Sequence, residues 1–406
     1  MHDVGRLYGC YGNPEVVSPN IDGLASESVR FESHFCQWPL CGPSRANIFS
    51  GCRPLTTGRV NNQPFFPDFR KRRGDDFRSL PELFRRSGYR SYGSGLVYHD
   101  VDDPPSWSDG FFRPALPAEG GRWIRLAQEA SPNPWYDEGS HRLIEERLAR
   151  LQAQGLGEEE LMRPDHLRRF RGPAVEAGDV ADEAYLDGQA SEAALGWIDG
   201  RVGKILEALR SRGLYENTIV VLTSDHGFHD GEHGYWGKHN LWDRSLAVPL
   251  LICLPVDGRR SVDAVTRWSG RSAPVPALTE HVDLYPTLCD LCGLDKPAWL
   301  EGDSLAPLFE DPGRAWKPAV FAHHKHMWHD RLQVYDMAHT VRTERCRFTV
   351  YLDEHGELLY RELFDYQEDP LETENRAESP GYAGTAAELA GRIGAGWQHI
   401  RPWVNQ

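Results

Sequence analysis

Thr218-Ile219-Val220-Val221-Leu222-Thr223-Ser224-Asp225-His226-Gly227 is the segment from which the fold class can be predicted. Its first six residues form a β-branched apolar run that predicts a buried strand, and the run stops at a polar Ser-Asp-His-Gly sequence. Upstream, residues 202–212 repeat apolar side chains at helical spacing. Helix, buried strand and polar loop in this order predict an α/β sheet with helices on both faces.

Two further elements extend this sheet. Residues 248–253 form a second apolar run, Val-Pro-Leu-Leu-Ile-Cys, that predicts another buried strand. Residues 79–88 predict a helix, because Ser79 can cap its N-terminus and Pro81 fits its first turn.

The C-terminal part of the chain has a different pattern. Short strands of a meander are predicted over residues 340–343, 347–352 and 357–364. We therefore expect a larger α/β domain over residues 1–311 and a small antiparallel α+β subdomain over residues 312–406.

Composition limits the possible partners. The chain has 406 residues and a formal net charge of −15, which argues against nucleic-acid binding because such proteins neutralise phosphates with clustered Lys and Arg. No apolar run is long enough to span a membrane, and the first residues do not resemble a signal peptide. As the sequence stands we expect a cytoplasmic protein, or a periplasmic or secreted one if an upstream signal has been lost.

The sequence Cys41-Gly42-Pro43-Ser44-Arg45 is the strongest functional signal. Pro43 fits the first turn of a helix, which places Cys41 at an N-terminus where free N–H groups and the helix dipole favour an anion. Arg45 is then expected beside Cys41, holding a nucleophile and an oxyanion together. The plainer alternative is a cysteine packed as a small hydrophobic residue.

This pentapeptide resembles the signature of type I sulfatases, members of the alkaline-phosphatase superfamily, and the following Ser50-Gly51 and Arg53-Pro54 fit as well. The resemblance implies an alkaline-phosphatase-like, mostly parallel sheet sandwiched by helices. It also implies that a formylglycine-generating enzyme oxidises Cys41 to formylglycine (3-oxoalanine). One hydroxyl of the hydrated aldehyde then attacks sulfur, and the second expels sulfate.

The same resemblance implies a metal site. Asp225 and His226 match the family pair that binds a divalent cation, usually Ca²⁺ with Mg²⁺ as an alternative, to which Cys41 contributes oxygen after oxidation. In the iduronate-2-sulfatase-like branch, an Asp-Asp pair precedes a Gly-Cys-Tyr-Gly stretch, and its second Asp falls on Asp3. The first falls on His2. An Asp-His pair that only caps the following turn is the alternative.

Two residues are expected at the substrate. Lys238 follows a Gly-Glu-His-Gly segment, as does the family lysine that contacts sulfate, although an exposed loop lysine has the same pattern. His99 matches a family histidine that can protonate the leaving oxygen, with a loop or core histidine as the alternative. Leu96 replaces a family lysine.

The His-rich residues 321–329 are expected to be a loop, either at the rim of the pocket or elsewhere on the surface.

Some family elements are missing from this sequence. Family members have a buried strand before the Asp pair, and another that bears a substrate histidine, yet neither is found. We therefore expect Asp3 to lie on a fraying end.

The predicted activity is hydrolysis of a sulfate ester, most plausibly on a saccharide. Hydrolysis of phosphonate monoesters or phosphodiesters, and a truncated homologue without catalysis, are the alternatives.

Overall fold

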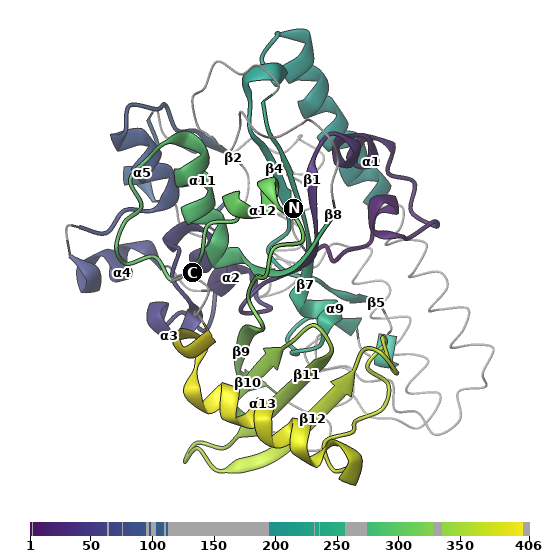
Figure 1. The fold of residues 1–406 in the computed structure, drawn as a ribbon. Helices are drawn as coiled ribbons and strands as arrows, with labels where there is room; N and C mark the ends of the chain where they lie inside the picture. The colour runs from purple at the N-terminus through teal and green to yellow at the C-terminus, as the bar shows by residue number, and fades with distance from the viewer. Residues whose placement is uncertain are drawn as a thin grey trace, which may run out of the picture.

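The structure is a computed structural model that describes residues 1, 3–62, 65–74, 76–94, 97–98, 103–108, 111–112, 195–230, 232–234, 236–255, 274–327 and 335–400. Figure 1 shows a central sheet flanked by helices and a second sheet beside it. No helix in these ranges is both long and apolar enough to cross a membrane.

The central sheet has four strands among the described residues, in the order β4-β7-β1-β8. Their bounds are β1 Val29–Phe35, β4 Val220–Thr223, β7 Ala247–Cys253 and β8 Pro274–Glu280. β1 pairs in parallel with β8, whereas β7 is antiparallel to both β1 and β4. Strands β1, β4 and β8 therefore run in one direction, and their carboxyl ends lie at the same edge of the sheet.

Helices cover both faces of this sheet, as the strand pattern predicts. Leu250 and Ile252 of the fully buried β7 join one apolar cluster with α11 (Leu284–Cys292) and α12 (Ala306–Glu310). The alternate residues Leu251 and Cys253 join a second cluster with α1 (Pro19–Ser26) and a helix over 195–211. Alternation of side chains along a strand places successive residues in different layers.

The other described helices lie around this core. Ser79 caps α5 by accepting a hydrogen bond from the Glu82 amide, which confirms the predicted helix start. The remaining helices are α2 Cys41–Ser50, α3 Pro54–Thr57, α4 Phe66–Arg73, α5 Leu80–Arg86, α9 Asp243–Leu246 and α13 Ala383–Ala395. In the described part of the chain, four strands of two residues each form two small sheets. β2 Gly93–Ser94 pairs with β3 Phe111–Phe112, and β5 His229–Asp230 pairs with β6 Trp236–Gly237.

The second sheet is entirely antiparallel, in the order β12-β11-β10-β9. Its strands are β9 Val320–Met327, β10 Tyr335–Arg342, β11 Cys346–Leu352 and β12 Leu358–Asp365. Helix α13 packs on one face, and the other face packs against β1 and α9 of the larger sheet through Phe35 and Leu246. The α/β fold with an antiparallel C-terminal sheet is thus confirmed.

The His-rich segment was expected to be a loop, and for residues 321–327 this prediction is wrong. These residues form β9, and residues 328 and 329 lie outside the described part of the chain. His323 and His324 are buried, with His323 Nδ1 2.8 Å from His339 Nδ1 and the ring of His324 packed against Trp38. A histidine counts as polar in a sequence pattern, but both of these histidines are buried, and as successive residues of a strand they lie on opposite faces of β9.

Candidate active site

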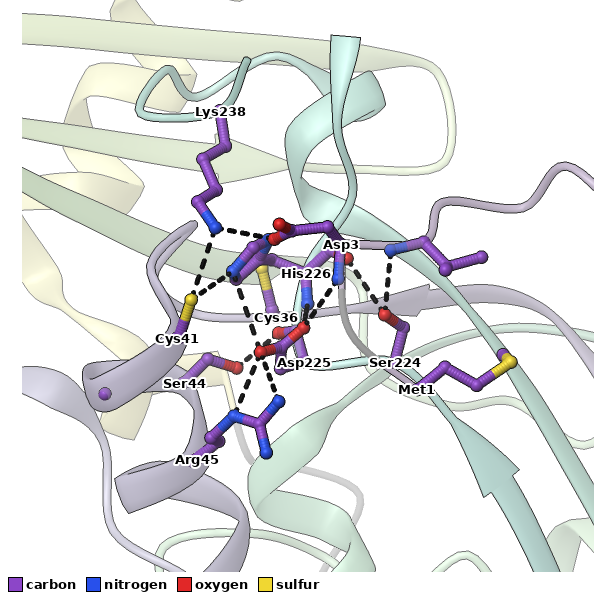
Figure 2. A network of polar contacts seen from close by, with 12 residues as sticks. Met1, Asp3, Cys36, Cys41, Ser44, Arg45, Ser224, Asp225, His226 and Lys238 are labelled. Atoms are coloured by element: carbon purple, nitrogen blue, oxygen red, sulfur yellow. Dashed lines mark hydrogen bonds and ion pairs between the residues drawn. The ribbon is translucent and has the colours of Figure 1, made fainter. Parts of the chain in front are cut away.

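The carboxyl ends of the three co-directional strands supply the residues of the candidate site. β1 leads to α2, which begins at Cys41, and β4 leads directly to Asp225 and His226. β8 leads to His281. Because these ends lie at one edge of the sheet, residues nearly 200 positions apart come together, as Figure 2 shows for Cys41, Asp225 and their neighbours.

Cys41 lies at the N-terminus of α2, as predicted. It is buried, and its Sγ lies 3.3 Å from His226 Nε2 and 3.2 Å from Lys238 Nζ. The amide of Gly42 donates to Asn62 Oδ1 at 2.8 Å. A negative charge at residue 41 would therefore be stabilised by the helix dipole and by the ammonium of Lys238.

Lys238 links Cys41 to Asp3. Its Nζ donates to Asp3 Oδ1 at 2.6 Å, and only 15% of its side chain is exposed. Burial alone would lower the pKa of Lys238, but the charges of Asp3 and Cys41 more than offset this and raise the pKa above its usual value. Lys238 therefore stays protonated and presents a fixed positive charge beside the nucleophile position.

Asp3 is held firmly, so the expectation of a fraying end is wrong. Its amide donates to Asp225 Oδ1 at 3.1 Å, and the Val4 amide donates to Ser224 Oγ at 3.0 Å. The amino group of Met1 donates to the Thr223 carbonyl at 2.6 Å. These bonds attach Met1, Asp3 and Val4 to the end of β4. Asp3 adopts φ 57°, an unusual value for a non-glycine residue.

Arg45 forms an ion pair with Asp225 that the sequence did not indicate. Its Nε and Nη2 donate to Asp225 Oδ2 at 3.0 and 2.8 Å, and the pair is almost buried, with 12% and 2% of the side chains exposed. Arg45 therefore orients the Asp225 carboxylate and compensates its charge. The sequence interpretation placed the guanidinium directly at the nucleophile and did not foresee this ion pair.

Two supporting residues were not recognised from the sequence. The Ser44 hydroxyl donates to the Asp225 carbonyl, and its Oγ lies 3.0 Å from His281 Nδ1. Burial lowers the pKa of His281 to about 3, so its imidazole is neutral. His281 follows β8 as Asp225 follows β4, and that shared position at a strand end was the available signal.

Three of the four predicted metal ligands lie close together, and the fourth, Asp225, lies beside them. Ligand atoms of Asp3, Cys41 and His226 all lie within 4.8 Å of one another, and Asp225 Oδ2 is 3.7 Å from His226 Nε2. Two carboxylates and one imidazole form a donor set that fits a hard divalent cation.

Three residues named from the sequence, His2, Leu96 and His99, lie outside the described part of the chain. Val97, two residues before His99, belongs to the described part of the chain and contacts the site. Its carbonyl lies 3.5 Å from Arg45 Nη1, which brings the 97–98 segment to the Arg45 side of the site.

Comparison with known protein families gives three matches. The model of the Sulfatase family matches residues 3–120, and that of the C-terminal part of N-sulphoglucosamine sulphohydrolase matches residues 231–397. The model described as type I phosphodiesterase / nucleotide pyrophosphatase matches residues 137–247. The first two matches contain Asp3, Cys41, Arg45 and Lys238.

Individual proteins similar to this chain are also sulfatases by name. Iduronate 2-sulfatase of Mus musculus is 26% identical over 381 residues, covering 73% of this chain and 68% of the relative. The Delta 4,5-hexuronate-2-O-sulfatase of Bacteroides thetaiotaomicron is 27% identical over 436 residues, covering 95% and 85%. A solved 2-O GAG sulfatase superposes with a TM-score of 0.68 at 22% identity, covering 99% of this chain and 91% of that one, and shows the same fold.

Proposed function

This chain belongs to the type I sulfatase family of the alkaline-phosphatase superfamily, and we propose that it hydrolyses a saccharide sulfate ester with Cys41, oxidised to formylglycine, as nucleophile. The observation that carries the proposal is the position of Cys41 Sγ between Lys238 Nζ, at 3.2 Å, and His226 Nε2, at 3.3 Å. This sulfur stands in for the nucleophilic oxygen of the mature residue.

The environment of residue 41 suits an attacking oxygen. Formylglycine would supply a geminal diol whose one hydroxyl attacks sulfur as the alcohol leaves, and whose other hydroxyl later expels sulfate. The ammonium of Lys238 and the N-terminus of α2 are both placed to stabilise the negative sulfate oxygens next to that diol. Lys238 is accordingly our sulfate-binding residue.

The acidic residues support a cation at the same place. Asp3, Asp225, His226 and the oxygen of residue 41 would hold Ca²⁺, or Mg²⁺ as the alternative, which would polarise the sulfate oxygens. Arg45 fixes one of these carboxylates through its bonds to Asp225 Oδ2. Ser44 fixes the backbone of Asp225 by donating to its carbonyl.

His99 is proposed as the proton donor to the leaving oxygen. The contact between the Val97 carbonyl and Arg45 supports this role, because it brings the chain to the site two residues before His99. A neutral leaving alcohol requires a proton in the transition state, and a positioned imidazole can supply it.

The names of the relatives suggest the first substrate to test. One of them is named iduronate 2-sulfatase and another Delta 4,5-hexuronate-2-O-sulfatase. We therefore propose a 2-O-sulfated uronic acid within a saccharide as substrate and a formylglycine-generating enzyme as maturation partner.

The test uses the full chain co-expressed with a formylglycine-generating enzyme. Mass spectrometry of the peptide that contains residue 41 measures its conversion to formylglycine. Sulfate release is then followed by ion chromatography on a 2-O-sulfated uronate disaccharide, an aryl sulfate and a phosphonate monoester. Cys41→Ser is the site variant. Cys292→Ser, at the end of α11 and outside the site, is the matched control.

We expect conversion of Cys41, release of sulfate by the wild type and by Cys292→Ser, and no turnover by Cys41→Ser. Preferred turnover of the phosphonate monoester would contradict the sulfatase proposal. Absence of any turnover by a fully converted chain would contradict it as well.

A further inference from the structure

Helix α9 (Asp243–Leu246) stands between the catalytic segments and the C-terminal sheet. On the catalytic side, the Gly227 amide donates to the Ser245 carbonyl at 2.8 Å, and the Cys36 amide donates to the Leu246 carbonyl at 2.9 Å. Gly227 directly follows His226, Cys36 lies on the way to Cys41, and Lys238 precedes α9 by only a few residues. A shift of α9 would therefore disturb each part of the site.

On its other side, α9 and the preceding loop are held by the C-terminal sheet. Arg342 Nε of β10 donates to Asp243 Oδ2 at 3.3 Å, and Trp242 Nε1 donates to Glu362 Oε2 of β12 at 3.3 Å. The amide of Asp243, in the first turn of α9, donates to Glu372 Oε2 at 3.0 Å. These three hydrogen bonds connect the Lys238 segment to the second sheet and to the turn that follows β12.

Glu372 has the most constrained position among these contacts. Its residue is 4% exposed, and its φ is 58°, a left-handed value that is strained for a non-glycine residue. Its Oε1 accepts from Arg347 Nε and from the Tyr366 hydroxyl, both at 2.5 Å. Its Oε2 reaches across to the Asp243 amide. One oxygen thus anchors the side chain within the C-terminal part, and the other holds α9.

We propose that Glu372 is a positioning residue of the active site, which fixes α9 through the Asp243 amide and thereby sets the place of Lys238 relative to Cys41. Glu372 does not contact the nucleophile itself, so it acts through the 238–246 segment. The acidic Asp-Pro turn over residues 365–372 then has a function: it carries this carboxylate to the boundary between the two sheets. The kinetic part of this inference rests on the proposed sulfatase function.

Glu372→Gln is the sharpest variant because it keeps the size of the side chain. In the wild type both carboxylate oxygens accept hydrogen bonds, whereas a glutamine must turn its NH₂ group toward a donor, either Arg347 or the Asp243 amide. Glu378→Gln is the matched control, because Glu378 forms an exposed ion pair with Arg361 of the same sheet and has no bond to α9.

Hydrogen–deuterium exchange of the full chain tests the contact without any substrate. We expect Glu372→Gln to speed exchange in peptides covering residues 238–246 by about tenfold or more, corresponding to 1.4 kcal/mol, and to speed exchange in β11 by a smaller factor, because Arg347 loses its charged partner. Glu378→Gln should leave both regions unchanged. Equal acceleration in the sheet and the 238–246 segment, or none in that segment, would overturn the proposal.

A double-mutant cycle gives the second readout. If Glu372 acts through Lys238, the loss of kcat/KM in Glu372→Gln combined with Lys238→Met should be smaller than the product of the two single losses. Multiplicative losses would overturn the proposal. An inactive wild type would instead contradict the proposed function, because the exchange experiment does not depend on turnover.

A milder variant serves if Glu372→Gln does not fold. Trp242→Phe removes the indole donor to Glu362 and keeps an aromatic ring. It should speed exchange over residues 238–246 in the same way, by a smaller factor. Wild-type exchange in that segment would count against the proposed role of the C-terminal sheet.

Discussion

Lys238 Nζ and Asp3 Oδ1 lie 2.6 Å apart, although the two residues are 235 positions apart in the sequence. The same ammonium is 3.2 Å from Cys41 Sγ, so one partly buried cation connects a predicted metal ligand to the predicted nucleophile. The bond to Asp3 fixes the direction of a long, flexible side chain. Lys238 is thereby oriented before a substrate arrives, which is the condition for strong electrostatic stabilisation.

Replacement of Lys238 by Met should lower kcat/KM for a sulfate ester by about 10²-fold or more, since a preorganised charged contact in a transition state is worth a few kcal/mol. Steady-state kinetics on the formylglycine-containing protein measures the effect. Lys296→Met is the control, because Lys296 forms a half-exposed ion pair with Asp290 next to α11. Equal activity of the two variants would contradict the role of Lys238.

The local parts of this site could be predicted from the sequence. The start of α2 at Cys41 and the end of β4 before Asp225 depend on short motifs, and the structure has both. The contact between Arg45 and Asp225 could not be predicted, because it depends on the order and direction of the strands. A fully buried strand such as β7 has the same apolar pattern whichever way it runs.

The same argument applies to His281 and to β9. His281 contributes because β8 pairs in parallel with β1, a long-range pairing that no local pattern specifies. Residues 321–327 were interpreted as a loop because a His-rich stretch is polar, but they form β9, and packing on its two faces buries the side chains of residues 321–324. Tertiary contacts thus decided the features that the sequence pattern left open.

A divalent cation should stabilise the chain through Asp3. If Ca²⁺ binds only the folded protein, Ca²⁺ at 100 times its Kd should raise the free energy of unfolding by about 2.7 kcal/mol. Asp3→Asn removes one carboxylate charge and should lose most of this gain. Urea unfolding with and without Ca²⁺, and with Mg²⁺ for comparison, measures it.

The surface variant Asp290→Asn is the control and should keep the full gain. An equal Ca²⁺ effect in Asp3→Asn and the wild type would exclude Asp3 as a ligand. Absence of any effect in the wild type would argue against the cation itself.

The buried His281 should make stability depend on pH. Burial lowers the pKa of the folded-state imidazole to about 3, so between pH 3 and the unfolded value of about 6.5 only the unfolded chain binds this proton. The stabilising contribution is complete above pH 6.5 and is lost as the pH falls toward 3, with a slope of up to about 1.4 kcal/mol per pH unit.

His281→Asn should remove this slope while retaining a polar group near Ser44. Urea unfolding at several pH values between 4 and 7 would measure the difference from the wild type, and His355→Asn, at an exposed position, provides the control. Parallel curves for His281→Asn and the wild type would show that His281 does not supply the linkage.

Gly227 should tolerate no side chain, because a Cβ at this position would lie 2.0 Å from the Arg244 carbonyl oxygen. Gly227→Ala must therefore push α9 away and weaken the bond from the Gly227 amide to Ser245. Overpacking of this kind costs about 1–3 kcal/mol, and the displacement of α9 should also lower activity. Denaturant unfolding and sulfate release on the same samples separate the two effects.

Gly391→Ala is the matched control for that substitution. Gly391 lies within α13 with open space around its Cβ position, so alanine should stabilise the helix by up to about 1 kcal/mol and leave activity unchanged. If Gly227→Ala were as stable and as active as Gly391→Ala, α9 would not be held tightly against the Asp225-His226 segment. If Gly227→Ala released less sulfate under conditions in which the variant is fully folded, the position of α9 would be shown to affect the rate of sulfate release.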